Sequence, residues 1–228
     1  MVISTMKFLP IYSTWVFDCD GVLLNSNVVK TEAFYRSAEP YGRDKADALV
    51  AFHIANGGVS RYVKFQYFLT DILGRERIDA DELKALLDAY AGYVRDGLMN
   101  CEVAAGLERL KELTPESSWM VVSGGDQEEL RWVFSARGLD AYFEDGIYGS
   151  PQTKDEILSW ARESDVLSFP AVFVGDSQYD YEAASRAGLD FIFVSAWSES
   201  SFDFKDADYS MKDIRSIVAA VSGAPDIS

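Results

Sequence analysis

Two aspartates follow a short apolar segment near the start of the chain, in the sequence FDCDGV. Asp18 and Asp20 lie two residues apart where this segment ends, so both carboxylates can project to the same side. Carboxylates this close repel each other, which raises one pKa unless a cation intervenes. Such a pair suits a nucleophile beside a general acid and base, or a metal site. Taken alone, the Asp-Gly dipeptide favours an ordinary turn.

A second acidic pair follows another apolar segment, in the sequence VGDSQYD. Asp176 stands where a strand is expected to end, which is the place for a ligand-binding residue in a parallel sheet. Asp180 lies four residues further on, and Ser177 precedes a helical pattern as its N-cap. An approximate capping box with Ser177 explains Asp180. It does not explain Asp176.

A hydroxyl and free backbone amides occur together in the segment VVSGGDQEE. Asp126 and Glu129 form the pattern of a capping box for the next helix, so Ser123 is not needed as a cap. The Ser123 hydroxyl and the Gly124 amide then suit a phosphate at a helix N-terminus. A plain glycine-rich turn explains the segment equally well.

One lysine stands at an unfavourable position in the segment SPQTKDEIL. Thr153 and Glu156 predict a capping box, which makes Lys154 the first residue of a helix. A cation there opposes the helix dipole at a cost of about 0.3 to 1 kcal/mol. A bound anion or a nearby carboxylate would offset this cost, whereas an exposed lysine tolerates it, and both interpretations remain open.

The four segments together place carboxylates, a hydroxyl, amides and a lysine at the same end of one expected sheet. A dianionic phosphate could not enter among so many carboxylates without a divalent cation. Ligands that are all oxygen favour Mg²⁺, because zinc prefers histidine and cysteine. The carboxylates concerned are those of Asp18, Asp20, Asp176 and Asp180.

Short apolar segments predict the buried strands of an α/β fold. They cover residues 14–17, 119–122, 171–174 and 191–194. Two of them lead through glycine-containing turns into helical patterns that end at Gly138 and Gly188, where a C-terminal glycine belongs. This alternation predicts a doubly wound, Rossmann-like parallel sheet with ligands at the carboxyl ends of its strands.

Residues 27–100 depart from this alternation, because their pattern predicts helices with no strand between them. The expected helices cover 28–38, halted near Pro40, 60–74, stopping at Gly74, and 80–97, stopping at Gly97. We interpret residues 27–100 as a small helical cap domain, inserted into a core domain formed by residues 1–26 and 101–228. The alternative is a set of extra helices packed on the edge of the sheet.

The composition excludes several classes of partner. The 228 residues are 48% hydrophobic and 25% charged, as in ordinary globular proteins, and the net charge of −16 repels nucleic acid and anionic membranes. No stretch approaches the ~18 apolar residues of a membrane span. The two cysteines suit a reducing compartment, and His53, the one histidine, would have to be the base of any histidine-dependent triad. We expect a cytoplasmic protein whose first residues form a short extension, not a signal peptide.

With all four motifs in order, the sequence resembles the haloacid dehalogenase superfamily. The similarity is to its phosphatase branch with a helical cap, as in phosphoglycolate phosphatase and β-phosphoglucomutase. The matching motifs are DCDGV at residues 18–22, VVSGG with Ser123, SPQTK with Lys154, and GDSQYD with Asp176 and Asp180. They extend over most of the chain.

The resemblance implies a catalytic role at each matching position. Asp18 would attack phosphorus and form an aspartyl-phosphate. Asp20 would protonate the leaving oxygen and then deprotonate the water that hydrolyses the intermediate. Ser123, Lys154 and the Gly124 amide would bind the transferring phosphoryl group, whose equatorial oxygens need their charge neutralised.

The resemblance also implies a set of metal ligands. Mg²⁺ would be held by Asp18, by the backbone carbonyl of Asp20 and by Asp176. Asp180 would help through water or by orienting Lys154.

Two cap residues are candidates for substrate binding. Arg61 lies in the segment GGVSRYVKF, which resembles the part of β-phosphoglucomutase where an arginine grips the second phosphate. A solvated arginine at a helix start is the alternative. Lys30 stands where the mutase carries a histidine, and this departure favours a hydrolase. For His53 we expect a structural role.

These observations predict a Mg²⁺-dependent phosphatase acting on a small phosphorylated metabolite, such as a sugar phosphate or a phosphoglycolate-like compound. The alternatives are a phosphosugar mutase of the β-phosphoglucomutase type and a non-catalytic binding or regulatory module. A monomer or a homodimer is expected.

Overall fold

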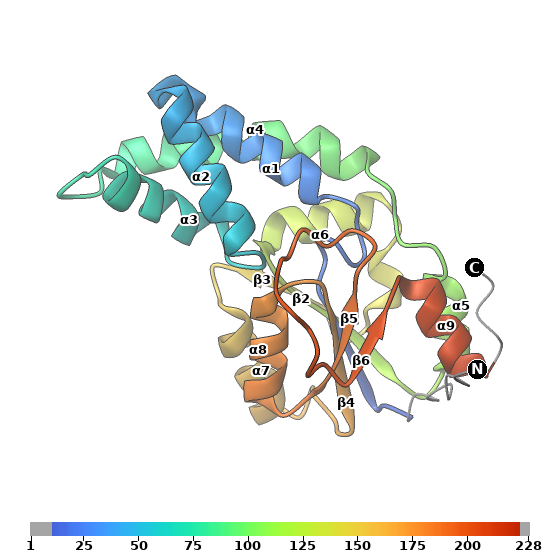
Figure 1. Cartoon of the computed structure of the whole chain (residues 1–228). Helices are drawn as coiled ribbons and strands as arrows, with labels where there is room; N and C mark the ends of the chain where they lie inside the picture. The colour runs from blue at the N-terminus through green and yellow to red at the C-terminus, as the bar shows by residue number, and fades with distance from the viewer. Residues whose placement is uncertain (1–10, 224–228) are drawn as a thin grey trace, which may run out of the picture.

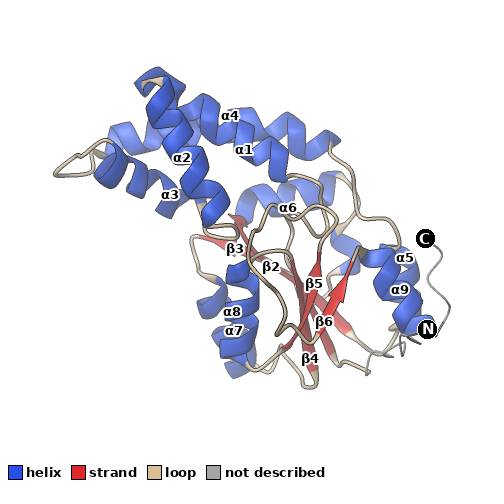
Figure 2. Cartoon of the chain, in the orientation of Figure 1, coloured by secondary structure: helices blue, strands red, loops and turns tan. Residues whose placement is uncertain are grey.

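A six-stranded parallel sheet forms the centre of the computed structural model, which describes residues 11–223 (Figure 2). The strand order is β3-β2-β1-β4-β5-β6. Most of the N-terminal extension expected from the sequence lies outside the described residues. The strands are β1 (Thr14–Phe17), β2 (Ser118–Asp126), β3 (Ile147–Ser150), β4 (Ala171–Gly175), β5 (Asp190–Val194) and β6 (Tyr209–Met211).

Helices cover both faces of this sheet, which is why its central strands are continuously apolar. One apolar cluster packs α7 and α8 against the sheet, and a second packs α5, α6 and α9 against the other face (Figure 1). These helices are α5 (Leu107–Leu113), α6 (Gln127–Ala136), α7 (Lys154–Glu163), α8 (Gln178–Ala187) and α9 (Ile214–Ser222). The prediction of a doubly wound α/β core is confirmed.

The chain changes direction across the sheet at β1. From β1 it passes to β2 and β3 on one side, and β4 then pairs with β1 from the other side. Loops leaving the carboxyl ends of β1 and β4 therefore diverge and leave a crevice, which is where ligands bind in folds of this kind.

Four helices lie together over the carboxyl ends of the strands (Figure 1), in the segment expected to form a cap, and we call them the cap helices. They are α1 (Asn27–Ala38), α2 (Arg43–Ala55), α3 (Arg61–Tyr67) and α4 (Ala80–Asn100), with short turns of 3-10 helix at Glu39–Tyr41 and π-helix at Phe68–Ile72. The rings of Phe34, Phe65 and Tyr90 pack on one another at the centre of these helices. No helix within residues 11–223 is long and apolar enough to cross a membrane.

The structure contains elements that were not predicted, and one helix ends later than expected. Helix α2 was not among the expected helices, although its buried residues Ala46, Leu49 and His53 have helical spacing. Strands β3 and β6 were not predicted because neither is an apolar run: β3 has the sequence IYGS, and β6 is the three residues YSM, which are not buried. Helix α4 does not stop at Gly97 but continues to Asn100.

Candidate active site

Asp18 lies at the carboxyl end of the central strand β1. Its side chain is 2% exposed, and its backbone N–H donates to the Val174 carbonyl at 2.9 Å, which continues the pairing with β4. The chain then turns sharply through Gly21, whose φ is +74°. A Cβ at Gly21 would overlap the Asp176 carboxylate, so glycine lets the first motif pack directly against the fourth.

Asp180 is held by the fourth motif itself. The expected capping box with Ser177 is present. One carboxylate oxygen of Asp180 accepts hydrogen bonds from the Asp176 N–H at 3.2 Å and the Ser177 hydroxyl at 2.6 Å, and the other oxygen pairs with Lys154. Both oxygens are therefore engaged within the protein, which favours the role of orienting Lys154.

Lys154 is buried between two carboxylates. Its ammonium lies 3.0 Å from the Asp18 carboxylate and forms a second ion pair with Asp180. Burial alone would lower the pKa of Lys154, but the two carboxylates outweigh it and raise that pKa above its usual value. The capping box of Thr153 and Glu156 is present as expected. The interpretation of Lys154 as an exposed helix-start lysine is wrong.

Three buried carboxylates form a group that fits a divalent cation. One oxygen each from Asp18, Asp176 and Asp180 lies within 4.8 Å of the others. Burial, and then the neighbouring carboxylates, raise the pKa of Asp176 well above its usual value; burial raises that of Asp18 to about 7, although Lys154 opposes the shift. The Asp18 oxygen nearest Lys154 has no hydrogen bond of good geometry. An oxygen-only set of buried carboxylates, one of whose oxygens has an ion pair but no hydrogen bond of good geometry, suits Mg²⁺.

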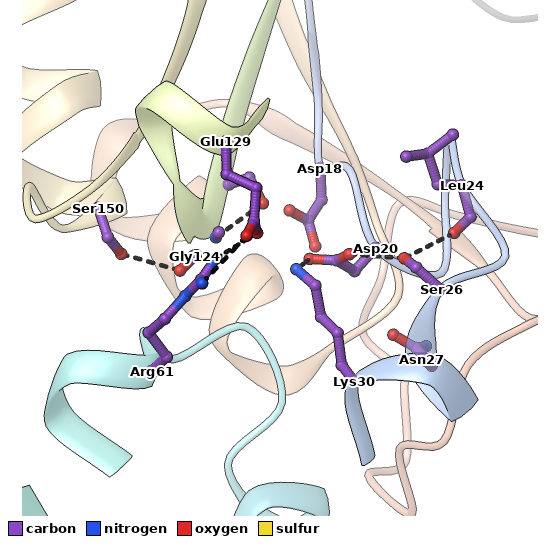
Figure 3. A network of polar contacts seen from close by, with 12 residues as sticks. Asp18, Asp20, Leu24, Ser26, Asn27, Lys30, Arg61, Gly124, Glu129 and Ser150 are labelled. Carbon is purple, nitrogen blue, oxygen red and sulfur yellow. Dashed lines mark hydrogen bonds and ion pairs between the residues drawn. The ribbon is translucent and has the colours of Figure 1, made fainter. Parts of the chain in front are cut away.

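The Asp20 carboxylate is not part of this group and contacts the start of the first cap helix. It accepts a hydrogen bond from the Ser26 hydroxyl at 2.6 Å and forms an ion pair with Lys30 (Figure 3). Burial raises the pKa of Asp20, but the Lys30 ammonium and these hydrogen bonds outweigh it and lower that pKa. The Asp20 carboxylate is thus held by a lysine, whereas the metal ligand expected at this position is the backbone carbonyl.

The segment with Ser123 is the irregular end of a strand, not the expected turn. Strand β2 runs through it to Asp126, with a shift in register against β3 after Val122. The buried Ser123 hydroxyl accepts a hydrogen bond from the Gly125 N–H at 3.1 Å. A Cβ at Gly124 would overlap the Gly58 carbonyl of the cap, so the core and the cap meet at this glycine.

Arg61 is buried, with 6% of its surface exposed, so the interpretation of a solvated arginine is wrong. It reaches from α3 to Glu129 on α6 (Figure 3). Its guanidinium lies 4.7 Å from the centre of the Tyr90 ring. Because Glu129 is engaged by Arg61, only half of the expected capping box forms, with the Asp126 side chain accepting the Glu129 N–H at 3.0 Å.

Three residues near the site were not predicted from the sequence. Asn27 donates hydrogen bonds to the Asp176 carboxylate at 3.0 Å and to the Trp197 carbonyl at 2.8 Å. Ser26 holds Asp20, and Lys64 is buried in the cap. The only signal for Lys64 was its spacing of three residues from Arg61 on one helix.

A cavity of about 610 Å³ separates the cap from the core. Carboxylates from the ends of β1 and β4 line its floor, and side chains of α1, α2 and α3 line its roof. Among its lining residues are Asp18, Asp20, Lys30, Arg61, Gly124 and Asp176. These six predicted residues therefore share one cavity, whereas Ser123, Lys154 and Asp180 are buried beneath it and are not among its lining residues.

Comparison with solved structures finds the same fold in bacterial proteins. A predicted phosphatase from Clostridium acetobutylicum is 21% identical with a TM-score of 0.73, covering 94% of this chain and 100% of that one. A predicted phosphoglycolate phosphatase from Haemophilus somnus 129pt is 19% identical with a TM-score of 0.71, covering 92% and 98%. CbbY from Rhodobacter sphaeroides, solved with phosphate, is 20% identical with a TM-score of 0.67, covering 92% and 99%.

A comparison with curated proteins finds no match. A family model, that of the haloacid dehalogenase-like hydrolases, matches residues 15–194. The matched region begins just before Asp18 and extends beyond Asp180, so it includes all four motifs. The chain belongs to the haloacid dehalogenase-like hydrolase family.

Proposed function

We propose that this protein is a Mg²⁺-dependent phosphatase that hydrolyses a small phosphorylated metabolite through an aspartyl-phosphate. The observation that carries the proposal is the placement of Asp18. Its carboxylate lies at the carboxyl end of the central strand, 3.0 Å from the Lys154 ammonium and beside two further buried carboxylates, and it lines the cavity under the cap.

Asp18 is the proposed nucleophile. Its oxygen attacks phosphorus in line with the departing alkoxide, and the phosphorus–oxygen bond of the ester breaks as the bond to Asp18 forms. Lys154, fixed between Asp18 and Asp180, stabilises negative charge on the transferring phosphoryl group. Ser123 and the Gly124 amide supply hydrogen bonds from the neighbouring strand.

Asp20 is the proposed proton-transfer group. Lys30 favours its ionised form, so Asp20 is ready to accept a proton from the water that hydrolyses the aspartyl-phosphate. In the first step it must instead deliver a proton to the leaving alkoxide. Lys30 can supply that proton, because its ammonium is in contact with the Asp20 carboxylate.

Asp18, Asp176 and the backbone of Asp20 are the proposed Mg²⁺ ligands. When bound, Mg²⁺ neutralises the charge that the phosphate dianion brings to an already acidic site. Asp180 holds Lys154, and Asn27 orients Asp176 through a hydrogen bond of 3.0 Å.

Residues 27–100 are the proposed cap domain, and the rest of the chain is the core. The contact of Gly58 with Gly124 and the ion pair of Arg61 with Glu129 close the cap over the site. A closed cap excludes bulk water and selects the substrate. Two similar structures are described as a predicted phosphoglycolate phosphatase and as a complex with phosphate, which supports a small phosphate monoester as substrate.

The test is phosphate release from a panel of phosphorylated sugars, acids and nucleotides, with Mg²⁺ and with EDTA. Asp18→Asn is the test variant, and Asp88→Asn, at a side chain that is 64% exposed on α4, is the matched control. We expect turnover that needs Mg²⁺, is lost in Asp18→Asn and is kept in Asp88→Asn. Equal turnover in EDTA contradicts the requirement for Mg²⁺. Turnover in Asp18→Asn contradicts the role of Asp18 as nucleophile.

Silence across the panel contradicts the phosphatase and leaves two alternatives. A stable phosphoryl group on Asp18 after incubation with a sugar bisphosphate would indicate a mutase. Absence of both turnover and phosphorylation would indicate a binding or regulatory module.

A further inference from the structure

The roof of the cavity carries three buried cations. Lys30, Arg61 and Lys64 all line the cavity, and they are 7%, 6% and 2% exposed. They come from two helices of the cap, α1 and α3. Since a buried charge is costly without a partner, the partner of each cation indicates its role.

Two of these cations are neutralised by carboxylates outside the cap. Lys30 pairs with Asp20, and Arg61 pairs with Glu129 (Figure 3). Both pairs join the cap to the core. The charge of Lys30 and of Arg61 is therefore already balanced in the ligand-free cavity.

Lys64 differs, because no carboxylate among residues 11–223 lies within ion-pair distance of it. Its polar contact is with the His53 Nδ1 atom at 2.8 Å, and its ammonium lies 5.5 Å from the centre of the Phe34 ring. An ammonium has no acceptor, so Lys64 donates this hydrogen bond and the proton of the neutral His53 ring is on Nε2.

His53 does not compensate the charge of Lys64. Burial, and then the Lys64 cation, lower the pKa of His53 to about 2, so its ring is neutral. Burial, and then the neighbouring Lys30 cation, lower the pKa of Lys64 to about 7. The cavity thus holds one buried amine whose positive charge has no partner within the described residues. A ligand anion would provide that partner.

We propose that Lys64, positioned by His53, binds a second anionic group of the substrate, a carboxylate or a phosphate, while the core motifs hold the transferring phosphoryl group. This inference rests on the proposed function. The cavity, at about 610 Å³, is much larger than a single phosphate needs.

The first test measures binding without turnover. His53 is the only histidine of the chain, so its ring nitrogens give an unambiguous ¹⁵N signal beside Lys64. The metal-free protein in EDTA is titrated at pH 6, where Lys64 is charged, with inorganic phosphate and, separately, with acetate, at constant ionic strength. We expect a neutral ring protonated on Nε2 and a saturable shift of Nδ1. A response to phosphate, to acetate or to both identifies the preferred anion, and the absence of any saturable shift overturns the proposal.

The second test measures selectivity with matched substrates. 3-Phosphoglycerate is compared with glycerol 1-phosphate, and fructose 1,6-bisphosphate with fructose 6-phosphate. Losing a charge-assisted hydrogen bond should raise KM about tenfold or more in Lys64→Met for the member with a second anionic group, and leave KM unchanged for the member whose phosphate monoester is the one anionic group. Lys64→Arg should restore part of the loss. Equal changes for both members indicate a structural role and contradict the proposal.

Lys84→Met is the matched control, because Lys84 is an exposed lysine of the cap. It should behave as the wild type in both tests. If the proposed function is wrong, the anion should still shift the ¹⁵N signal of His53. If the Lys64 site is wrong, the enzyme should still release phosphate. The two proposals are therefore tested separately.

Discussion

At the scale of single residues, the Lys154 ammonium balances the negative charge of two buried carboxylates. It has no exposed surface on its side chain and contacts two carboxylates. Removing one partner of a buried ion pair leaves the other charge buried and uncompensated, which costs far more than losing an exposed pair.

Lys154→Met should therefore lower the free energy of unfolding by about 3–5 kcal/mol. The matched control is Lys84→Met, since Lys84 and its partner Asp88 are 72% and 64% exposed. That change should cost less than about 1 kcal/mol. Urea unfolding at pH 8 measures both. Equal losses in the two variants would show that Lys154 is not the counter-charge of Asp18 and Asp180.

Lys64 should make stability depend on pH. Its pKa in the folded protein is about 7, below the usual lysine value, so above pH 7 the unfolded chain binds the extra proton. The cost of burying this charge is complete below pH 7 and fades as the pH rises toward the unfolded pKa. Lys30 and Lys154 add to the cost, whereas Asp20 and Glu199 reduce it.

The wild type should gain stability relative to Lys64→Met as the pH rises from 7 to 9.5, by on the order of 1 kcal/mol per pH unit. Urea unfolding at several pH values measures this difference. Parallel stability curves would contradict a buried lysine whose pKa is lowered.

Spacing and order along the chain predicted the core residues of the site. Asp18, Lys154, Asp176 and Asp180 stand at strand ends or helix starts, where short-range patterns are informative. Lys64 and Asn27 could not be predicted in this way. Their roles depend on a close approach of the cap to the core, and no local pattern encodes the ion pairs that leave Lys64 without a carboxylate.

At the scale of elements, helix α4 shows why a glycine can mislead. Gly97 was expected to end the helix, but it lies inside α4, where a Cβ would overlap the side chain of Val29 on α1. It is thus a contact between helices and not a cap. Gly92, one and a half turns earlier in the same helix, has no atom within 4 Å of the position of a Cβ.

The two glycines should respond oppositely to alanine. Gly92→Ala should stabilise the protein by about 0.5–1 kcal/mol, because alanine is the better helix former. Gly97→Ala should destabilise it by about 1–3 kcal/mol, because the added methyl group overpacks the contact with Val29. Thermal unfolding of both variants compares them directly. A stabilising Gly97→Ala would contradict the close packing of α1 against α4.

At the scale of the whole molecule, the net charge is −16, and three of the carboxylates are buried close together. Their mutual repulsion lowers the stability of the folded protein, and a bound cation relieves it. A cation that binds only the folded state stabilises it by mass action, by about 2.7 kcal/mol at a hundredfold excess over Kd. Mg²⁺ should therefore raise the unfolding temperature.

Asp176→Asn should abolish this response to Mg²⁺. In EDTA, the same variant should be at least as stable as the wild type, because one of three repelling carboxylates is gone and an amide oxygen can still accept the hydrogen bond of Asn27. Differential scanning calorimetry with Mg²⁺ and with EDTA measures both effects. Asp88→Asn, at an exposed position, should respond to Mg²⁺ as the wild type does. A full Mg²⁺ response in Asp176→Asn would place the cation elsewhere.

Covalent catalysis by Asp18 is the central claim, and trapping the intermediate tests it most directly. Asp20→Asn should slow hydrolysis of the aspartyl-phosphate, and the phosphorylated enzyme should accumulate with acetyl phosphate as substrate, because its carboxylate leaving group needs no proton from residue 20. Rapid denaturation and reduction with borohydride convert an aspartyl-phosphate to homoserine, which peptide mass spectrometry locates. We predict homoserine at position 18 with substrate and none without it. Turnover with an unmodified Asp18, or homoserine at another aspartate, would contradict the account.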